Sequence, residues 1–172
     1  MALEFKQSVF FKILEAELPE VSMEPSGIKS HFHRISTFIA AIPDSLKDYA
    51  YAEGKWTIAQ VLGHITDTQT VFLYRILSIA RGNESKLPGF DENRWVATGN
   101  YAACTLPEIK SLYDISSAHT LSTVLRLRKE DYAKKGEANQ IVISVEEILG
   151  YLMAHEIHHL KTIQERYLNR VG

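Results

Sequence analysis

The stretch from Ser144 to Tyr167, SVEEILGYLMAHEIHHLKTIQERY, carries the strongest fold signal in the chain. Ser144 stands three residues before Glu147, the spacing at which a hydroxyl and a carboxylate each accept a hydrogen bond from a free backbone N–H at a helix start. Apolar residues then recur at the three- and four-residue intervals of one helical face. They are Ile148, Leu149, Leu152, Ile157, Leu160 and Ile163. The stretch therefore predicts one amphipathic helix over 144–167.

Two upstream stretches carry the same start signal. Thr57 stands three residues before Gln60, and Thr105 stands three residues before Glu108. A fourth apolar pattern opens at Pro25. The predicted helices span 25–42, 57–81, 105–128 and 144–167, and a further short helix is expected in the first seventeen residues. We interpret the chain as an all-α four-helix bundle with one long crossover loop, in a single domain of residues 1–172.

Two connections interrupt the helical pattern. Residues 82–104 form a long crossover, and its aromatic residues favour packing over disorder. Residues 132–143 form a shorter loop. The apolar triplet Ile141–Ile143 at its end resembles a strand, but we expect it to be too short to build a sheet.

Composition excludes several classes of function. The 172 residues are 45% apolar and 23% charged, as in an ordinary soluble domain. A net charge of −2 without a basic run gives no electrostatic basis for nucleic-acid binding. Cys104 is the only cysteine, which excludes an intramolecular disulfide, and no basic cluster adjoins it, so we expect a structural role. The absence of a signal-like start and of an apolar run of about 18 residues predicts a cytoplasmic protein without a membrane segment.

A pair of histidines gives the first functional signal. His155 and His159 are four residues apart, so on a helix their side chains lie about 6 Å apart on one face. Both fall in the apolar stripe, where an unpaired imidazole is costly to bury. Two such rings can ligate one divalent ion, and imidazole suits Zn, Ni, Cu or Fe. Hydrogen-bonded core histidines are the alternative. His31, His33 and His119 are expected to be surface or hydrogen-bonded core residues.

His64 is the best candidate for a third ligand, because it lies among apolar residues of its own predicted helix. Three protein ligands leave an open coordination position, which is typical of catalytic metal sites. Residues 155–159 also match the H-E-x-x-H pattern of zinc peptidases. The extended form of that pattern is absent, since Thr162 and Glu165 occupy the positions of its later Gly and His. We therefore disfavour a protease.

Four further residues are expected near the three histidines. Asp67 follows His64 by one turn and could orient an imidazole, although a solvated acid is an equal alternative. His158 is expected at the rim of the three-histidine site, or facing a neighbouring helix. Arg75 points along the same face as His64, and we favour a structural ion pair for it over contact with an anionic substrate group. Trp95, or Phe90, is expected to pack over or beside the three-histidine end and limit solvent access, with a plain linker or a dimer contact as alternatives.

The sequence resembles the DinB superfamily of metal-binding four-helix bundles. The matching segments are Lys55–Asp67 (KWTIAQVLGHITD), Leu87–Trp95 (LPGFDENRW) and Ala154–Leu160 (AHEIHHL). Their order and intervals agree with the family, and the resemblance covers roughly residues 25–170.

The resemblance implies that His64, His155 and His159 bind a metal ion, usually zinc or nickel, and that the chain forms a homodimer. It further implies a thiol-dependent S-transferase or a hydrolase acting on a small molecule, with a low-molecular-weight thiol as a candidate co-substrate. A non-catalytic, stress-associated metal-binding dimer remains the alternative.

Overall fold

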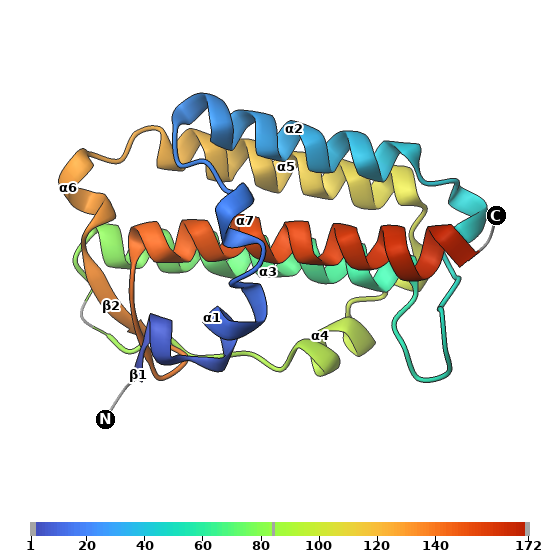
Figure 1. The fold of residues 1–172 in the computed structure, drawn as a ribbon, viewed down its shortest axis with the longest axis horizontal. Coiled ribbons are helices and arrows are strands. Elements are labelled where there is room, and N and C mark those ends of the chain that lie inside the picture. The colour runs from blue at the N-terminus through green and yellow to red at the C-terminus, as the bar shows by residue number, and fades with distance from the viewer. Residues whose placement is uncertain (1–2, 84, 171–172) are drawn as a thin grey trace.

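The computed structural model describes residues 3–83 and 85–170, and four long helices form the expected bundle (Figure 1). Helix α3 packs against α5 and α7, and α2 packs against the same two helices. In Figure 1, α2 and α7 run in one direction, whereas α3 and α5 run in the other. The start of α3 therefore lies beside the end of α7. The bounds are α2 (Pro25–Ala41), α3 (Ile58–Ala80), α5 (Leu106–Val124) and α7 (Val145–Thr162).

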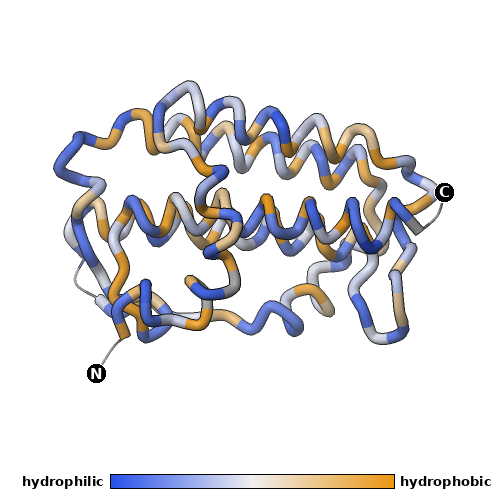
Figure 2. The backbone as a smooth tube through the Cα atoms, viewed as in Figure 1, coloured by the Kyte–Doolittle hydropathy of each residue, from blue (hydrophilic) through white to orange (hydrophobic). Residues whose placement is uncertain are grey.

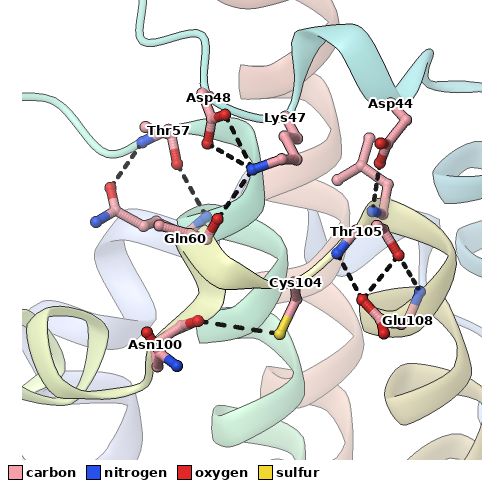
Figure 3. Close-up of polar contacts among 11 residues, drawn as sticks. Asp44, Lys47, Asp48, Thr57, Gln60, Asn100, Cys104, Thr105 and Glu108 are labelled. Atoms are coloured by element: carbon pink, nitrogen blue, oxygen red, sulfur yellow. Dashed lines mark hydrogen bonds and ion pairs between the residues drawn. The ribbon is translucent and has the colours of Figure 1, made fainter.

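The predicted helix starts at Thr57, Thr105 and Ser144 are confirmed by their capping contacts. Figure 3 shows those of α3 and α5. Thr57 Oγ1 accepts from the backbone N–H of Gln60 at 3.2 Å, and Gln60 Oε1 accepts from the N–H of Thr57 at 2.9 Å. Thr105 and Glu108 cap α5 in the same way. The Asp44 carboxylate also accepts from the first backbone N–H of α5 at 2.7 Å. These contacts hold the starts of α3 and α5 at one end of the bundle.

The long crossover after α3 is a packed segment, as its aromatic residues predict. It contains α4 (Glu92–Thr98) and a 3₁₀ turn, Tyr101–Ala103. The Tyr101 ring lies so close to α3 that a Cβ atom at Gly63 would be 2.2 Å from it. The Tyr101 hydroxyl donates to Asp67 on α3 at 2.7 Å. The crossover is thereby fixed along α3.

The expectation that Ile141–Ile143 cannot build a sheet is wrong. Strand β3 (Ile141–Ser144) is the centre of a three-stranded sheet, parallel to β1 (Leu3–Glu4) and antiparallel to β2 (Lys135–Ala138). Asn139 and Gln140 join β2 to β3 with φ of 51° and 62°. Two residues with positive φ are typical of a tight hairpin turn. Glycine usually occupies the second position, so Gln140 concealed the turn in the sequence.

Short elements complete the chain. The N-terminal segment contains the expected short helix, α1 (Val9–Leu14), but β1 precedes it. Helix α5 ends at Val124, four residues before the predicted end, and a short α6 (Lys129–Tyr132) follows. A π-helical turn, Ile163–Tyr167, continues α7. Helix α1 contacts α7, and the chain that follows α1, with the 3₁₀ turn Leu18–Glu20, crosses α7 in Figure 1.

Hydrophobic and hydrophilic stretches follow one another along every long helix, as in amphipathic helices (Figure 2). The apolar residues gather in one core that includes Ile35 of α2, Leu62 of α3, Ile109 of α5 and Leu152 of α7, all fully buried or nearly so. Among the described residues, no helix is both long enough and apolar enough to cross a membrane.

Candidate metal centre

Three histidines from two helices converge between α3 and α7. His64 lies about two turns into α3, and His155 and His159 lie on successive turns in the second half of α7. Nε2 of His155 is 3.1 Å from Nε2 of His64 and 3.0 Å from Nε2 of His159. The candidate ligand nitrogens of the three rings all lie within 4.8 Å of one another. The antiparallel pairing of α3 and α7 thus brings together residues that are 91 positions apart.

Burial keeps all three rings neutral near pH 7. It lowers the pKa of His64 to about 4, from an ordinary value of 6.5. Burial, then the nearby His64 and His158, lower the pKa of His159 to about 3. The pKa of His155 falls well below 6.5, because the ring is buried and three histidines surround it. A neutral imidazole has the free lone pair that a metal ion requires.

The positions of the nitrogens fit one divalent ion. Nitrogens bound at about 2.0–2.1 Å, with angles of about 90–110° at the metal, lie about 2.9–3.4 Å apart. Two of the three separations, 3.0 and 3.1 Å, fall in this range, and the third, between His64 and His159, is at most 4.8 Å. Hydrogen bonds alone satisfy the cluster less well, because the single lone pair of His155 Nε2 would have to accept from His64 and His159 at once. In either arrangement the His155 ring proton lies on Nδ1, which is buried without a hydrogen-bond partner among the described residues.

Two aromatic rings lie beside the histidine cluster, and neither was predicted as a site residue. The Trp56 ring lies 5.0 Å from the His64 ring, between centroids. Tyr151 lies nearly parallel to His155, with centroids 6.1 Å apart and an interplanar angle of 14°. Tyr151 could have been found from the sequence, since it precedes His155 by one turn on the same helical face. Trp56 precedes α3 and so lies outside any periodic pattern.

The three histidines line a pocket of about 300 Å³. Apolar residues form most of the rest of its wall, as in ordinary small-molecule sites. They come from α1, α3, α7 and the small sheet, and include Leu14, Phe72, Ile141, Ile143 and Ile148. The sheet that the sequence did not predict is therefore part of the site.

Asp67 and Trp95 lie away from the histidine pocket. Asp67 accepts the hydrogen bond from Tyr101, and burial raises its pKa. The Trp95 side chain is 40% exposed and packs against Phe90, with ring centroids 4.7 Å apart. Both Asp67 and Trp95 line a neighbouring hollow, whereas Phe90 also lines the histidine pocket. Of the two aromatic residues expected beside the histidines, Phe90 lines the histidine pocket and Trp95 does not.

His158 and Arg75 both line the pocket. His158 lies at its rim, 39% exposed, with Nδ1 3.5 Å from a carboxylate oxygen of Glu17. Arg75 is 8% exposed and donates from Nη2 to the carbonyl oxygen of Pro88 at 2.9 Å. In place of the structural ion pair that we favoured, Arg75 has a backbone carbonyl. None of the ion pairs among the described residues includes it.

Glu156 belongs to the bundle core. Its fully buried carboxylate lies 2.6 Å from Nε2 of His31 and accepts from Gln69 Nε2 at 3.2 Å and the Tyr113 hydroxyl at 3.3 Å. One residue from each long helix meets here. The H-E-x-x-H interpretation would need this carboxylate beside the metal position, so the contacts argue against it. His31 is a hydrogen-bonded core residue, and His33 and His119 are exposed, as expected.

A four-helix bundle with three convergent histidines between antiparallel helices defines the class of this protein. The chain belongs to the DinB superfamily, whose sequence profile matches residues 28–163. A protein from Oceanobacillus iheyensis, named "Putative metal-dependent hydrolase", is 30% identical over 173 residues, which cover 95% of this chain and 98% of that protein.

Solved structures show the same fold. YfiT from Bacillus subtilis, described as "a probable metal-dependent hydrolase with an unusual four-helix bundle topology", is 18% identical, with a TM-score of 0.69. The match covers 87% of this chain and 91% of YfiT. A mycothiol-dependent maleylpyruvate isomerase is 14% identical, with a TM-score of 0.65 over 90% of this chain. This chain covers 62% of that isomerase.

Proposed function

We propose that this protein binds one divalent metal ion through Nε2 of His64, His155 and His159, and that it is an enzyme acting on a small molecule. Zinc and nickel are the proposed ions, because borderline-soft metals suit neutral imidazole ligands. The observation that carries the proposal is the geometry of three neutral, converging nitrogens on the wall of a pocket. The names of the relatives agree with a metal-dependent activity.

The pocket favours an enzyme over a purely structural metal site. Structural zinc sites usually have four protein ligands and no access for a substrate. Here three ligands face a pocket of about 300 Å³. A stress-associated, non-catalytic bundle would need no such opening beside its metal ion.

We propose a hydrolase or a thiol-dependent S-transferase as the two forms of the activity. A bound ion would ionise a coordinated water or thiol near neutral pH. In hydrolysis, water adds across the cleaved bond, and one product takes OH while the other takes H. In S-transfer, the sulfur bonds to an electrophilic carbon, and the leaving group departs with the electron pair and takes the thiol proton. In either form, Phe72, Phe90 and Trp56 would exclude bulk water and hold the apolar part of the substrate.

Metal content tests the site directly. We expect protein purified without tags or chelators to contain about one divalent ion per chain, measured by inductively coupled plasma mass spectrometry. The double variant His155→Ala/His159→Ala should contain none, because one imidazole cannot hold the ion. His158→Ala is the matched control, since it removes a rim histidine of the same helix and should keep the metal. Equal metal content in the double variant and the control would disprove the site.

Activity tests separate the two chemistries. A panel of low-molecular-weight thiols with an electrophilic substrate reports S-transfer, and a panel of small esters and amides reports hydrolysis. The homodimer stays a proposal, which light scattering on the purified protein tests.

A further inference from the structure

In the described part of the chain, the Arg75 guanidinium in the histidine pocket forms no ion pair with a carboxylate. The Arg75 side chain, on α3, lines the same pocket as the three histidines and is 8% exposed. Among the residues that the structure describes, its only hydrogen bond is the one from Nη2 to Pro88. Its Nε is buried without a hydrogen-bond partner. The guanidinium also lies over the Phe72 ring, 5.2 Å from the centroid.

Such a cation is costly where it lies. An arginine is rarely buried without a carboxylate or phosphate, because its charge loses hydration that neutral groups replace poorly. One carbonyl and one aromatic face offset part of that loss. Burial lowers the pKa of Arg75, but arginine remains a cation at any physiological pH. The site therefore retains a positive charge that an anion could neutralise.

We infer that Arg75 binds an anionic group, such as a carboxylate, on the small molecule that occupies the histidine pocket. The ligand would combine an apolar body, which the aromatic wall accepts, with one negative charge directed at the guanidinium. This assignment rests on the proposed function, because it specifies the substrate class of the same pocket. A purely structural role, in which Arg75 only fastens the Pro88 loop to α3, is the competing explanation.

Glu92 is the residue of the pocket that argues against an anionic ligand. It also lines the pocket, and its carboxylate would favour a cationic ligand and repel an anionic one. Glu92 is exposed, however, so solvent screens its charge, whereas the Arg75 charge is buried. The buried charge should therefore dominate the preference of the pocket.

Three matched probes test the inference: 3-phenylpropanoate, its neutral amide and 3-phenylpropylamine. They share one apolar body and differ in charge. Titrations by calorimetry use the full chain, both after chelation and after loading with zinc. In chelated wild-type protein we expect the acid to bind about tenfold more tightly than the amide, the effect of one charge-assisted hydrogen bond. The amine should bind most weakly.

Variants identify the residue responsible. Arg75→Met should abolish the preference for the acid, whereas Arg94→Met, which removes an exposed arginine from α4, should keep it. In wild-type protein, the acid but not the amide should shift the ¹⁵N–¹H resonance of the Arg75 Nε–H group. That measurement decides the question even if Arg75→Met does not fold.

The outcomes also separate this inference from the proposed function. A preference for the acid that needs zinc and survives in Arg75→Met would place the carboxylate on the metal, which overturns the inference and supports the metal site. Equal binding of acid and amide, or tighter binding of the amine, would also overturn it. An Arg75-dependent preference in a protein that binds no zinc would support the anion site and refute the metal proposal.

Discussion

Replacing Gly63 by Ala should destabilise the protein, although alanine is the better helix former. A Cβ atom at position 63 would lie 2.2 Å from the Tyr101 ring, and carbon atoms in contact need about 3.5 Å, so the ring must retreat by about 1.3 Å. Such overpacking costs about 1–3 kcal/mol. The movement also strains the 2.7 Å hydrogen bond from Tyr101 to Asp67, worth about 1–2 kcal/mol. The higher helix propensity of alanine offsets about 1 kcal/mol of this loss. The expected net loss is about 1–4 kcal/mol in the free energy of unfolding.

Gly150→Ala is the matched control, in the interior of α7. Its nearest neighbour for a Cβ atom is a Leu18 side-chain carbon at 4.0 Å, so the methyl group has room. This variant should gain about 0.5–1 kcal/mol from propensity alone. Urea unfolding of the chelated proteins, followed by circular dichroism, measures both changes. In protein that already carries Tyr101→Leu, adding Gly63→Ala should lower the free energy of unfolding much less than it does in the wild type. If Gly63→Ala were neutral or stabilising, the close approach of Tyr101 to α3 would be refuted.

Two further predictions concern buried polar groups. Because burial lowers the pKa of His64 to about 4 and of His159 to about 3, the unfolded chain binds protons below about pH 6.5 that the folded chain does not. The free energy of unfolding of the chelated protein should thus be constant above about pH 6.5. It should fall as the pH is lowered towards 4, by up to about 1.4 kcal/mol per pH unit for each histidine. Urea unfolding midpoints at several pH values measure this change, and a profile that does not vary with pH would contradict the burial of the histidines. Glu156→Leu should cost about 2–4 kcal/mol by leaving Gln69 and Tyr113 without their acceptor, whereas exposed Glu165→Leu should change little in the same assay.

The sequence predicted the elements that depend on local contacts. The helix starts at Thr57, Thr105 and Ser144 follow from capping pairs three residues apart, so neighbouring residues contain all the information. The sheet depends instead on pairing between β1 and β3, which lie at opposite ends of the chain. A two-residue stretch and a hairpin turn without glycine carry almost no local signal. The sheet was missed for that reason, and with it part of the pocket wall.

The convergence of the three histidines could be anticipated, but the surroundings could not. Helical spacing places His155 and His159 together whatever the fold, and the apolar neighbours of His64 indicate that it faces the core. The hydrogen-bond partner of Arg75 depends on the path of the crossover segment. That partner is the backbone carbonyl of Pro88, and because almost every residue has such a group, the sequence cannot identify it. Which of Phe90 and Trp95 lines the histidine pocket depends on the same crossover.

Adjacent residues of α7 show why a motif alone misassigns chemistry. Successive residues of a helix point about 100° apart, so His155 and Glu156 face different neighbours. His155 and His159 face His64 on α3, whereas Glu156 faces His31 on α2 and Tyr113 on α5. In a zinc peptidase the same letters place the glutamate beside the metal-bound water. Here the core already holds that carboxylate with three contacts. Glu156 therefore cannot act as the base in the proposed reaction, and His158 and Glu92 are the side chains of the pocket wall that could take that role.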